Sequence, residues 1–380
     1  MTESTTQLGT SSVGSRRAIV DDALAVLPAW LTARLLVAAA YVVAVVVADR
    51  LTPGVRPHQI DEGLLAWDGT WYRDIATGGY ARTGIEGLRF FPLFPLLGRV
   101  LGLGFTSAAG PVLVVVANAC SFVVLVFVRR LVVLEGRGRA VAQRAVWYTA
   151  LFPAAFVLVW GYAEALMLAA AVGTLLAARR RLWWWAAVAG VVAASRPLGV
   201  LVILPIAIEL ARAWSTSLRP QRVAGAIATA APLATCAGYL LWVRSAYGDA
   251  LLPFRVQDDL RETTINPFAR VWDGLAQVVG PERFGDGLHI PFAALFVGLL
   301  VLTFRYWPAS YGVYAGAVMV AALSAENLNS LERYGLNAFP LVLTLAVLTH
   351  DERVDRVVLS VSAGGLVALT SLAWLGAYVP

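Results

Sequence analysis

The feature that most constrains this chain is a series of long apolar stretches separated by short charged segments. A helix needs about 20 apolar residues to cross the hydrocarbon core of a bilayer, and lipid offers its backbone no other hydrogen-bonding partner. Hydrophobic residues make up 59% of the sequence and charged residues only 14%, which suits that environment. The apolar stretches lie near residues 23–48, 108–128, 145–160, 163–178, 182–195, 197–211, 223–243, 291–305, 308–325, 336–349 and 357–378.

This pattern predicts an all-α polytopic membrane protein with about eleven transmembrane helices. Residues 1–22 are mostly polar and are expected to form a disordered cytoplasmic tail, followed by a single transmembrane domain over residues 23–380. Several stretches are shorter than a straight span requires. Some pairs are therefore expected to be broken or re-entrant helices that neighbouring helices shield from lipid.

The distribution of arginine predicts the orientation in a plasma membrane. Cytoplasmic loops of membrane proteins carry an excess of positive charge, and the arginine clusters fall on one side when the spans are threaded in order. The N-terminus is then cytoplasmic, and the long loops near 49–107 and 244–290 face away from the cytoplasm. The clustered residues are Arg16, Arg17, Arg129, Arg130, Arg137, Arg139, Arg144, Arg179–Arg181, Arg212, Arg219, Arg222, Arg305, Arg353 and Arg356.

Composition excludes several function classes. The chain has no lysine, so it lacks both a Schiff-base lysine and the lysine of a phosphate-binding P-loop. Its two cysteines, Cys120 and Cys236, lie within apolar stretches and indicate neither a disulfide framework nor a thiolate metal cluster. We expect no metal and no cofactor. The net charge of +6 comes from arginines between apolar stretches, so membrane lipids are expected partners and nucleic acid is not.

The first long loop contains AWDGTWYRDIATGGY, residues 66–80. Trp67, Trp71 and Tyr72 are compatible with a simple belt of interfacial aromatic residues. Asp68 is not explained by such a belt, because a carboxylate among indole rings at the membrane edge is unfavourable unless it is paired or used. Asp68 is therefore the candidate catalytic residue. The pair Asp61 and Glu62 is a second acidic candidate, although charges at the start of a helix are commonly stabilised by its first turn.

Two further stretches belong to the same predicted side. RFFPLFP, residues 89–95, has two prolines three residues apart, which predicts a kinked or re-entrant segment. LFPAAFVLVWGYAEAL, residues 151–166, places Tyr162 and Glu164 at an outer turn. There they are either solvated or part of the cleft that contains Asp68.

Two arginines are predicted on the side that the positive-inside bias disfavours. Arg196 lies in ASRPLGV, and Arg333 lies beside Tyr334 in LERYGLNAFP. An arginine at such a place needs a counter-charge. One alternative is a structural salt bridge with Glu164 or Asp68. The other is binding of a phosphate, whose oxygens match the paired donors of a guanidinium group.

In their order and surroundings, these stretches resemble the PIG-V-like mannosyltransferases. The eukaryotic members add the second mannose during assembly of glycosylphosphatidylinositol anchors, and bacteria carry relatives. The resemblance covers about residues 60–345, and its most specific part is WDGTWYRDIATGGY followed by FFPLFP. The chain departs from the family at YAEA, residues 162–165, where relatives often carry a serine-rich version.

The resemblance implies a GT-C type glycosyltransferase fold with its active site on the non-cytoplasmic face. It also implies a polyprenyl-phosphate-mannose donor, a lipid-linked or cell-envelope glycan or glycolipid as acceptor, and inversion at the anomeric carbon. The position of the family's catalytic base matches Asp68, and Arg196 and Arg333 would stabilise the departing phosphate. A transporter or flippase of a lipid-linked glycan is the alternative, although such folds often show paired repeats and charges near the midplane.

The predicted orientation can be tested by thiol labelling of a chain that lacks Cys120 and Cys236. Single cysteines at Thr83 and Thr263 should react with a membrane-impermeant reagent on intact cells, because both loops are predicted to face away from the cytoplasm. A cysteine at Ala140, within an arginine cluster, should react only after permeabilisation. The reverse pattern would place the loops, and the candidate site, in the cytoplasm.

Overall fold

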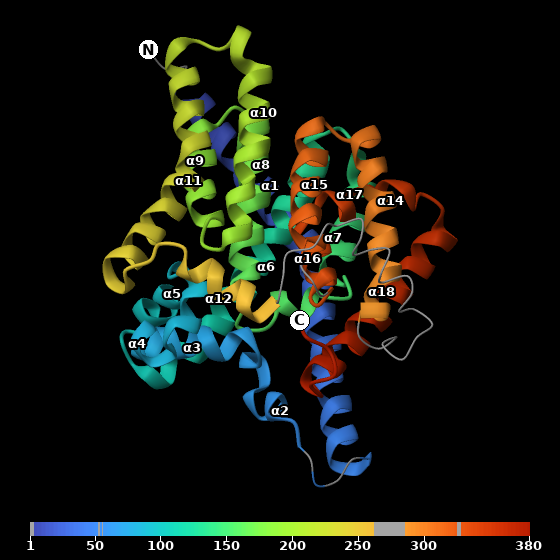
Figure 1. Cartoon of the computed structure of the whole chain (residues 1–380). Helices are drawn as coiled ribbons and strands as arrows, with labels where there is room; N and C mark the ends of the chain where they lie inside the picture. Colours follow the sequence, from blue (N-terminus) through green and yellow to red (C-terminus); the bar gives the residue numbers. More distant parts are fainter. Residues whose placement is uncertain (1–3, 52–53, 55, 262–285, 325–327) are drawn as a thin grey trace.

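The computed structural model describes residues 4–51, 54, 56–261, 286–324 and 328–380, and these residues form helices and no strand (Figure 1). Of the predicted loop 244–290, residues 262–285, with Thr263, lie outside the described residues. The helical elements are α1 (Ser4–Val46), η1 (Val47–Leu51), α2 (His58–Glu62), η2 (Gly63–Leu65), α3 (Asp68–Gly78), α4 (Tyr80–Thr83), η3 (Ile85–Arg89), α5 (Leu93–Leu101), α6 (Thr106–Leu134), α7 (Gly138–Ala150), η4 (Ala155–Leu158), α8 (Glu164–Arg179), α9 (Trp183–Ala193), η5 (Pro197–Val202), α10 (Ile203–Ala213), η6 (Trp214–Thr216), α11 (Arg219–Tyr247), α12 (Leu252–Arg261), η7 (Asp286–His289), α14 (Ile290–Tyr306), α15 (Ala309–Leu323), α16 (Leu331–Asn337), α17 (Pro340–Leu348) and α18 (Glu352–Trp374).

The helices fit a multi-pass membrane protein. Within the described residues, six helical segments are long and apolar enough to cross a bilayer, or seven if the bent pair α16 and α17 counts as one span. The sequence predicts about eleven. Each predicted stretch contains helix, but α9 has 11 residues and α15 has 15, which is less than a straight span needs. An apolar stretch does not show where a helix breaks.

The N-terminal stretch differs from its prediction. Helix α1 begins at Ser4 and continues to Val46, so most of residues 1–22 are helical where a disordered tail is expected. Extending an existing helix avoids the unfavourable nucleation step, and the long apolar part of α1 is the helix that is extended. The polar composition of the stretch was therefore a poor guide to its backbone. Its cytoplasmic location stays a prediction.

Helix α1 shows how the bundle meets its surroundings. Its buried apolar positions are alanine and valine residues, including Ala29, Ala33 and Ala40, and the helix packs against α6 and α18. Small residues allow the backbones of neighbouring helices to approach closely. Its exposed positions carry large apolar residues such as Leu31 and Leu35. A helix that is apolar on both faces suits a lipid environment.

Helix α6 packs against α1, α5, α7 and α8. Helix α9 lies between α8 and α11, and α10 contacts α8, α11 and α15. Figure 1 shows the short elements α3, α4 and α5 gathered at the lower left, with α12 beside them and α2 below them towards the centre. The predicted break in RFFPLFP is present, because η3 ends at Arg89 and α5 begins at Leu93. This end of the molecule carries the candidate site.

One irregular segment runs through the interior. Between α7 and α8, residues 151–163 contain only the short η4, yet almost all of them are buried. Buried carbonyl groups need partners. The Asn118 side chain donates from Nδ2 to the Val159 carbonyl at 2.8 Å, and Arg34 donates from Nη2 to the Leu158 carbonyl at 3.4 Å. Arg34 also donates from Nε to the Asn118 side-chain oxygen at 2.9 Å.

Charged contacts at helix ends join segments that the sequence places on one side of the membrane. Asp22 on α1 contacts Arg130 on α6 at 2.6 Å. Arg179 at the end of α8 contacts both Glu135, which follows α6, at 2.7 Å and Glu209 on α10 at 2.9 Å. These contacts fit the predicted threading of the chain. Which side of the membrane these ends face stays a prediction.

Candidate functional site

A pocket with a cavity volume of about 640 Å³ lies where the short elements α3 and η3 meet η5, α12 and α16. This volume is within the range of roughly 300–1,000 Å³ that is usual for ligand sites. The pocket is lined by Trp67, Asp68, Trp71, Tyr72, Arg89, Phe90, Arg196, Pro197, Leu198, Leu201, Pro253, Phe254, Gln257, Ala321, Asn329, Ser330, Arg333, Tyr334, Asn337, Val379 and Pro380. Asp68, Arg196 and Arg333 thus line one pocket, although they are far apart in the sequence.

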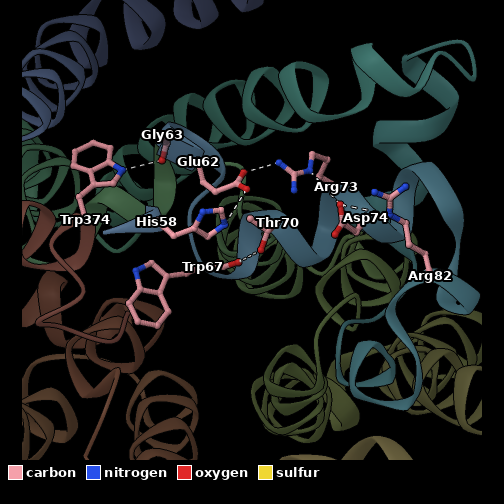
Figure 2. A network of polar contacts seen from close by, with 9 residues as sticks. All are labelled: His58, Glu62, Gly63, Trp67, Thr70, Arg73, Asp74, Arg82 and Trp374. Carbon is pink, nitrogen blue, oxygen red and sulfur yellow. Dashed lines mark hydrogen bonds and ion pairs between the residues drawn. The ribbon is translucent and has the colours of Figure 1, made fainter. Parts of the chain in front are cut away.

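Asp68 is the first residue of α3, and the turn before it is held from two directions. The preceding residue, Trp67, has a φ of 56°, a conformation that is strained for a residue with a bulky side chain. Its indole nitrogen donates to the carbonyl of Ala373 at 2.8 Å. In return, the Trp374 indole donates to the carbonyl of Gly63 at 2.8 Å, as Figure 2 shows. These bonds to the end of α18 fix the direction of Asp68.

The backbone of Asp68 rests on the irregular segment between α7 and α8. Its N–H donates to the hydroxyl oxygen of Tyr162 at 3.2 Å, and the neighbouring Gly161 N–H donates to the Leu64 carbonyl at 2.8 Å. A Cβ at Gly161 would lie 2.7 Å from a methyl group of Leu65, so a larger residue would require that side chain to move. Tyr162 is fully buried, and this burial raises the pKa of its hydroxyl well above its usual range. The group therefore stays neutral.

Four charged side chains form a continuous chain at the pocket wall. Nη1 of Arg333 lies 2.9 Å from Oδ2 of Asp68 and 3.1 Å from Oε1 of Glu164. The same Glu164 oxygen forms an ion pair with Nη1 of Arg196. The Glu164 side chain is completely buried, whereas that of Asp68 is 22% exposed. Glu164 is therefore the internal counter-charge of two arginines, and Asp68 is the carboxylate that reaches the pocket.

These ion pairs hold the two arginines but do not use all of their N–H donors. Burial alone would lower the pKa of Arg196, but the nearby Glu164 carboxylate more than offsets this effect and raises it. Glu164 also lies in the first turn of α8, where the helix dipole favours a negative charge. A guanidinium group has five N–H donors, and the contact with Glu164 involves Nη1 of Arg196. Arg196 therefore forms the salt bridge with Glu164 and also lines the pocket, and its binding of a phosphate stays a prediction.

A second buried network holds the backbone beside Arg333. The next residue towards the N-terminus, Glu332, is fully buried and lies 2.8 Å from Nδ1 of His289. It also accepts a hydrogen bond from the Tyr378 hydroxyl at 2.9 Å. On the pocket side, Ser330 has a φ of 68° and its hydroxyl accepts from Nη2 of Arg333 at 3.3 Å. Neighbouring residues of α16 thus anchor the helix in opposite directions.

An aromatic wall continues from Asp68 along α3. The rings of Trp71 and Phe90 are stacked with centroids 5.7 Å apart, and Tyr72 is buried against Phe90 with centroids 5.0 Å apart. The guanidinium carbon of Arg89 lies 5.1 Å from the Trp71 ring centroid. This distance is within the range of a cation–π interaction. The wall therefore presents both an aromatic surface and a positive charge to the pocket.

The second acidic candidate lies elsewhere. Asp61 contacts Nε of Arg56 at 2.8 Å and is largely exposed. Figure 2 shows the Glu62 carboxylate between the ring of His58, at 3.2 Å, and the guanidinium of Arg73, at 2.5 Å. Neither Asp61 nor Glu62 lines the pocket. Both serve ion pairs near the start of α3. Tyr162 and Glu164 are fully buried and do not line the pocket, whereas Tyr334 does.

Several pocket residues were not predicted from the sequence. Arg89 is the first residue of RFFPLFP, a stretch predicted only to return the chain to the membrane. The signal that could have identified it is the one used for Arg196, an arginine on the disfavoured side among aromatic residues. Asn329, Ser330 and Gln257 carry no comparable signal, because single amide and hydroxyl side chains are common in loops.

The chain matches no protein-family model and no curated protein sequence. The resemblance to PIG-V-like mannosyltransferases therefore rests on the sequence motifs. Among the residues that the structure describes, no three His, Cys, Asp or Glu side chains are grouped so that they could hold a metal ion.

The buried position of Glu164 generates a stability prediction. Glu164→Gln leaves two guanidinium groups at the pocket wall without their internal counter-charge, so it should destabilise the protein by about 3–5 kcal/mol. Asp68→Asn should be milder, since Asp68 is partly exposed and Arg333 keeps Glu164. Thermal unfolding in detergent measures both, with the exposed Glu86→Gln as control. Equal melting temperatures for Glu164→Gln and the control would contradict the assigned role of Glu164.

Proposed function

We propose that this chain is a membrane glycosyltransferase that transfers a mannosyl residue from polyprenyl-phosphate-mannose to a lipid-linked or cell-envelope glycan acceptor. The observation that carries the proposal is the pocket in which the Asp68 carboxylate, the Arg196 and Arg333 guanidiniums and an apolar wall meet. A lipid-linked sugar phosphate offers one complementary group for each of these three features. The motif resemblance supplies the identity of the sugar.

The arginines suit the phosphate of the donor. Guanidinium groups present paired donors to phosphate oxygens, and both side chains are held in place by the buried Glu164. They are therefore oriented before the ligand arrives. Donors that are already oriented stabilise the negative charge that develops on the departing phosphate. The apolar residues Leu198, Leu201 and Phe254 line the same pocket and suit a hydrocarbon chain.

Asp68 suits the role of general base. Its Oδ2 contacts Arg333, and a carboxylate has a second oxygen that can accept a proton. The acceptor hydroxyl would transfer its proton to Asp68 while its oxygen bonds to the anomeric carbon. The bond from that carbon to the phosphate oxygen breaks, and polyprenyl phosphate leaves with the bonding electrons. Attack opposite to the leaving group inverts the anomeric carbon, so a β-linked donor gives an α-mannoside.

The proposal includes a GT-C type fold, about eleven spans with some short or broken helices, and a site facing away from the cytoplasm. The segments that line the pocket lie at turns, or at the ends of spans next to turns, that the arginine distribution assigns to that side. Because these segments line one pocket, they support the predicted order in which the chain crosses the membrane. A donor that reaches its enzyme within the membrane also accounts for a site beside helices of membrane-crossing length.

A transporter or flippase would use the same arginines to hold a lipid phosphate. It would have to carry its ligand across the bilayer, and binding charges near the midplane are typical of that task. Purified protein should be incubated with radiolabelled polyprenyl-phosphate-mannose and membrane lipid extract. Transfer of label to a new product supports the enzyme. Translocation in vesicles without any product would instead support the transporter.

The sharpest test of the mechanism is Asp68→Asn. The amide keeps the shape of the side chain but cannot accept the acceptor's proton, so turnover should fall by at least about 100-fold. Donor binding should be largely retained, because Arg196 and Arg333 keep Glu164 as counter-charge. Single-turnover transfer and donor binding are measured on the same preparation.

Asp61→Asn and Glu62→Gln are the matched controls, since they remove nearby carboxylates that do not line the pocket. Both should retain turnover close to that of the wild type. If Asp68→Asn were active and either control inactive, the base would be the Asp61 and Glu62 pair. Full activity in all three variants would remove the catalytic role from this loop.

Replacing the arginines by lysine tests phosphate binding. Arg196→Lys and Arg333→Lys keep the charge but lose the planar set of donors, so the KM for the donor should rise about 10- to 100-fold, the effect of losing a charged hydrogen bond. Protein levels in membranes should stay near normal, as in the exposed control Arg82→Lys. Loss of the protein from membranes with normal activity per molecule would show that the arginines are only structural.

A further inference from the structure

Asn337 is the last residue of α16, and the helix end does not use its side chain oxygen. The backbone carbonyl of Asn337 accepts a hydrogen bond from the Tyr314 hydroxyl at 3.3 Å, and the next N–H, that of Ala338, donates to the Tyr334 carbonyl at 2.8 Å. Asparagine side chains often bond to neighbouring backbone groups. The Oδ1 atom of Asn337 is buried and has no hydrogen-bond partner among the residues that the structure describes. The local structure therefore does not explain why this position carries an amide.

The packing of α16 directs Asn337 towards the pocket. Arg333 and Asn337 lie one turn apart on the same face of the helix, and both line the pocket. Gly335 lies on the opposite face, where a Cβ would be 2.2 Å from the ring of Phe296 on α14. A larger residue would require this buried ring to move. With one face packed closely against α14, the other face presents Arg333 and Asn337 to the pocket.

The unpaired atom of Asn337 limits the kind of group that can bind it. A carbonyl oxygen accepts hydrogen bonds and cannot donate them, so Oδ1 needs an N–H or O–H donor. A buried polar atom without a partner is unfavourable, and rotation about the last side-chain bond can turn this oxygen towards the pocket. In a lipid-linked sugar phosphate, neither the ionised phosphate nor the hydrocarbon chain has a donor. Only the sugar hydroxyls do.

We propose that Asn337 binds a hydroxyl group of the transferred sugar and helps to determine which sugar the pocket accepts. The proposal rests on the proposed function, which places the donor phosphate at Arg333, one helical turn or about 5.4 Å from Asn337 along α16. The sugar is bonded directly to that phosphate. Asn329 and Ser330, just before α16, also line the pocket and carry neutral groups that bind hydroxyls. A sugar is thus favoured by the structure as well as by the sequence motifs.

Asn337→Leu should have two effects of opposite sign. Leucine is similar in size and has no polar atom, so the melting temperature of the ligand-free protein in detergent should rise by about 2 °C, because an unpaired buried acceptor is removed. Polyprenyl-phosphate-mannose should nevertheless bind about tenfold more weakly, since a sugar hydroxyl loses its partner. Polyprenyl phosphate, which has no sugar, should bind with wild-type affinity. Both dissociation constants follow from the dependence of the melting temperature on ligand concentration.

Thr344→Val is the matched control. Thr344 is fully buried in α17, but its hydroxyl donates to the Pro340 carbonyl at 2.9 Å and lies 2.8 Å from the Thr303 hydroxyl. It does not line the pocket. Valine at this position should lower the melting temperature and change neither affinity. Asn337→Ala is a second variant and should show the same difference between the two lipids. A donor with the contacted hydroxyl removed should bind more weakly to the wild type but not to Asn337→Leu.

Unchanged binding of polyprenyl-phosphate-mannose to Asn337→Leu would overturn the proposal. An equal loss of both lipids would do the same, because Asn337 would then act through the arginines or the fold. A lower melting temperature of the ligand-free variant would show that the amide is structural. None of these measurements needs transfer. If the wild type transfers mannose while the variant binds it normally, only the role of Asn337 is overturned. The expected binding pattern in a protein that makes no mannoside would overturn the glycosyltransferase function and leave the hydroxyl site standing.

Discussion

The structure of the candidate site depends on one buried carboxylate. Glu164 has no exposed surface, and a single oxygen of its carboxylate contacts guanidinium groups of both Arg196 and Arg333. Removing such charges from water is unfavourable unless they are paired, so these residues hold one another in place. They belong to three separate parts of the chain. Through Arg333 the arrangement extends to Asp68 on a fourth, which gives the pocket its charged wall.

The position of Glu164 depends in turn on the break in helical structure between α7 and α8. If α7 had continued as a straight span, residues 151–163 would have been helical and no helix N-terminus would lie at this depth. Instead α8 begins inside the bundle, and its dipole favours the Glu164 carboxylate. Two buried carbonyls of the irregular segment, those of Leu158 and Val159, accept hydrogen bonds from Arg34 and Asn118. A charged residue within the first span therefore supports the site without contacting the pocket.

Much of this arrangement follows from the sequence, and the rest depends on where helices break. Apolar stretches predict an all-helical membrane protein, and the side assigned to each turn by arginine charge groups Asp68 with Arg196 and Arg333. The start of the break at residue 151 could not be predicted, because residues 151–160 are apolar like the rest of the predicted stretch 145–160. Asp61 was a candidate because it and Glu62 form a second acidic pair in the same loop as Asp68. Only the fold shows that it turns to Arg56, and that Arg89 reaches the pocket.

The shared position of Arg333 connects donor binding to the reactivity of Asp68 under the proposed function. Nη1 of Arg333 contacts both Asp68 and Glu164. A donor phosphate that binds Arg333 competes with Asp68, the more exposed of the two carboxylates, and leaves the buried contact with Glu164 in place. A carboxylate oxygen that is released from a guanidinium group can instead accept a hydrogen bond from another donor. Under the proposed function, Asp68 is therefore released towards the acceptor hydroxyl when the donor phosphate takes its place on Arg333.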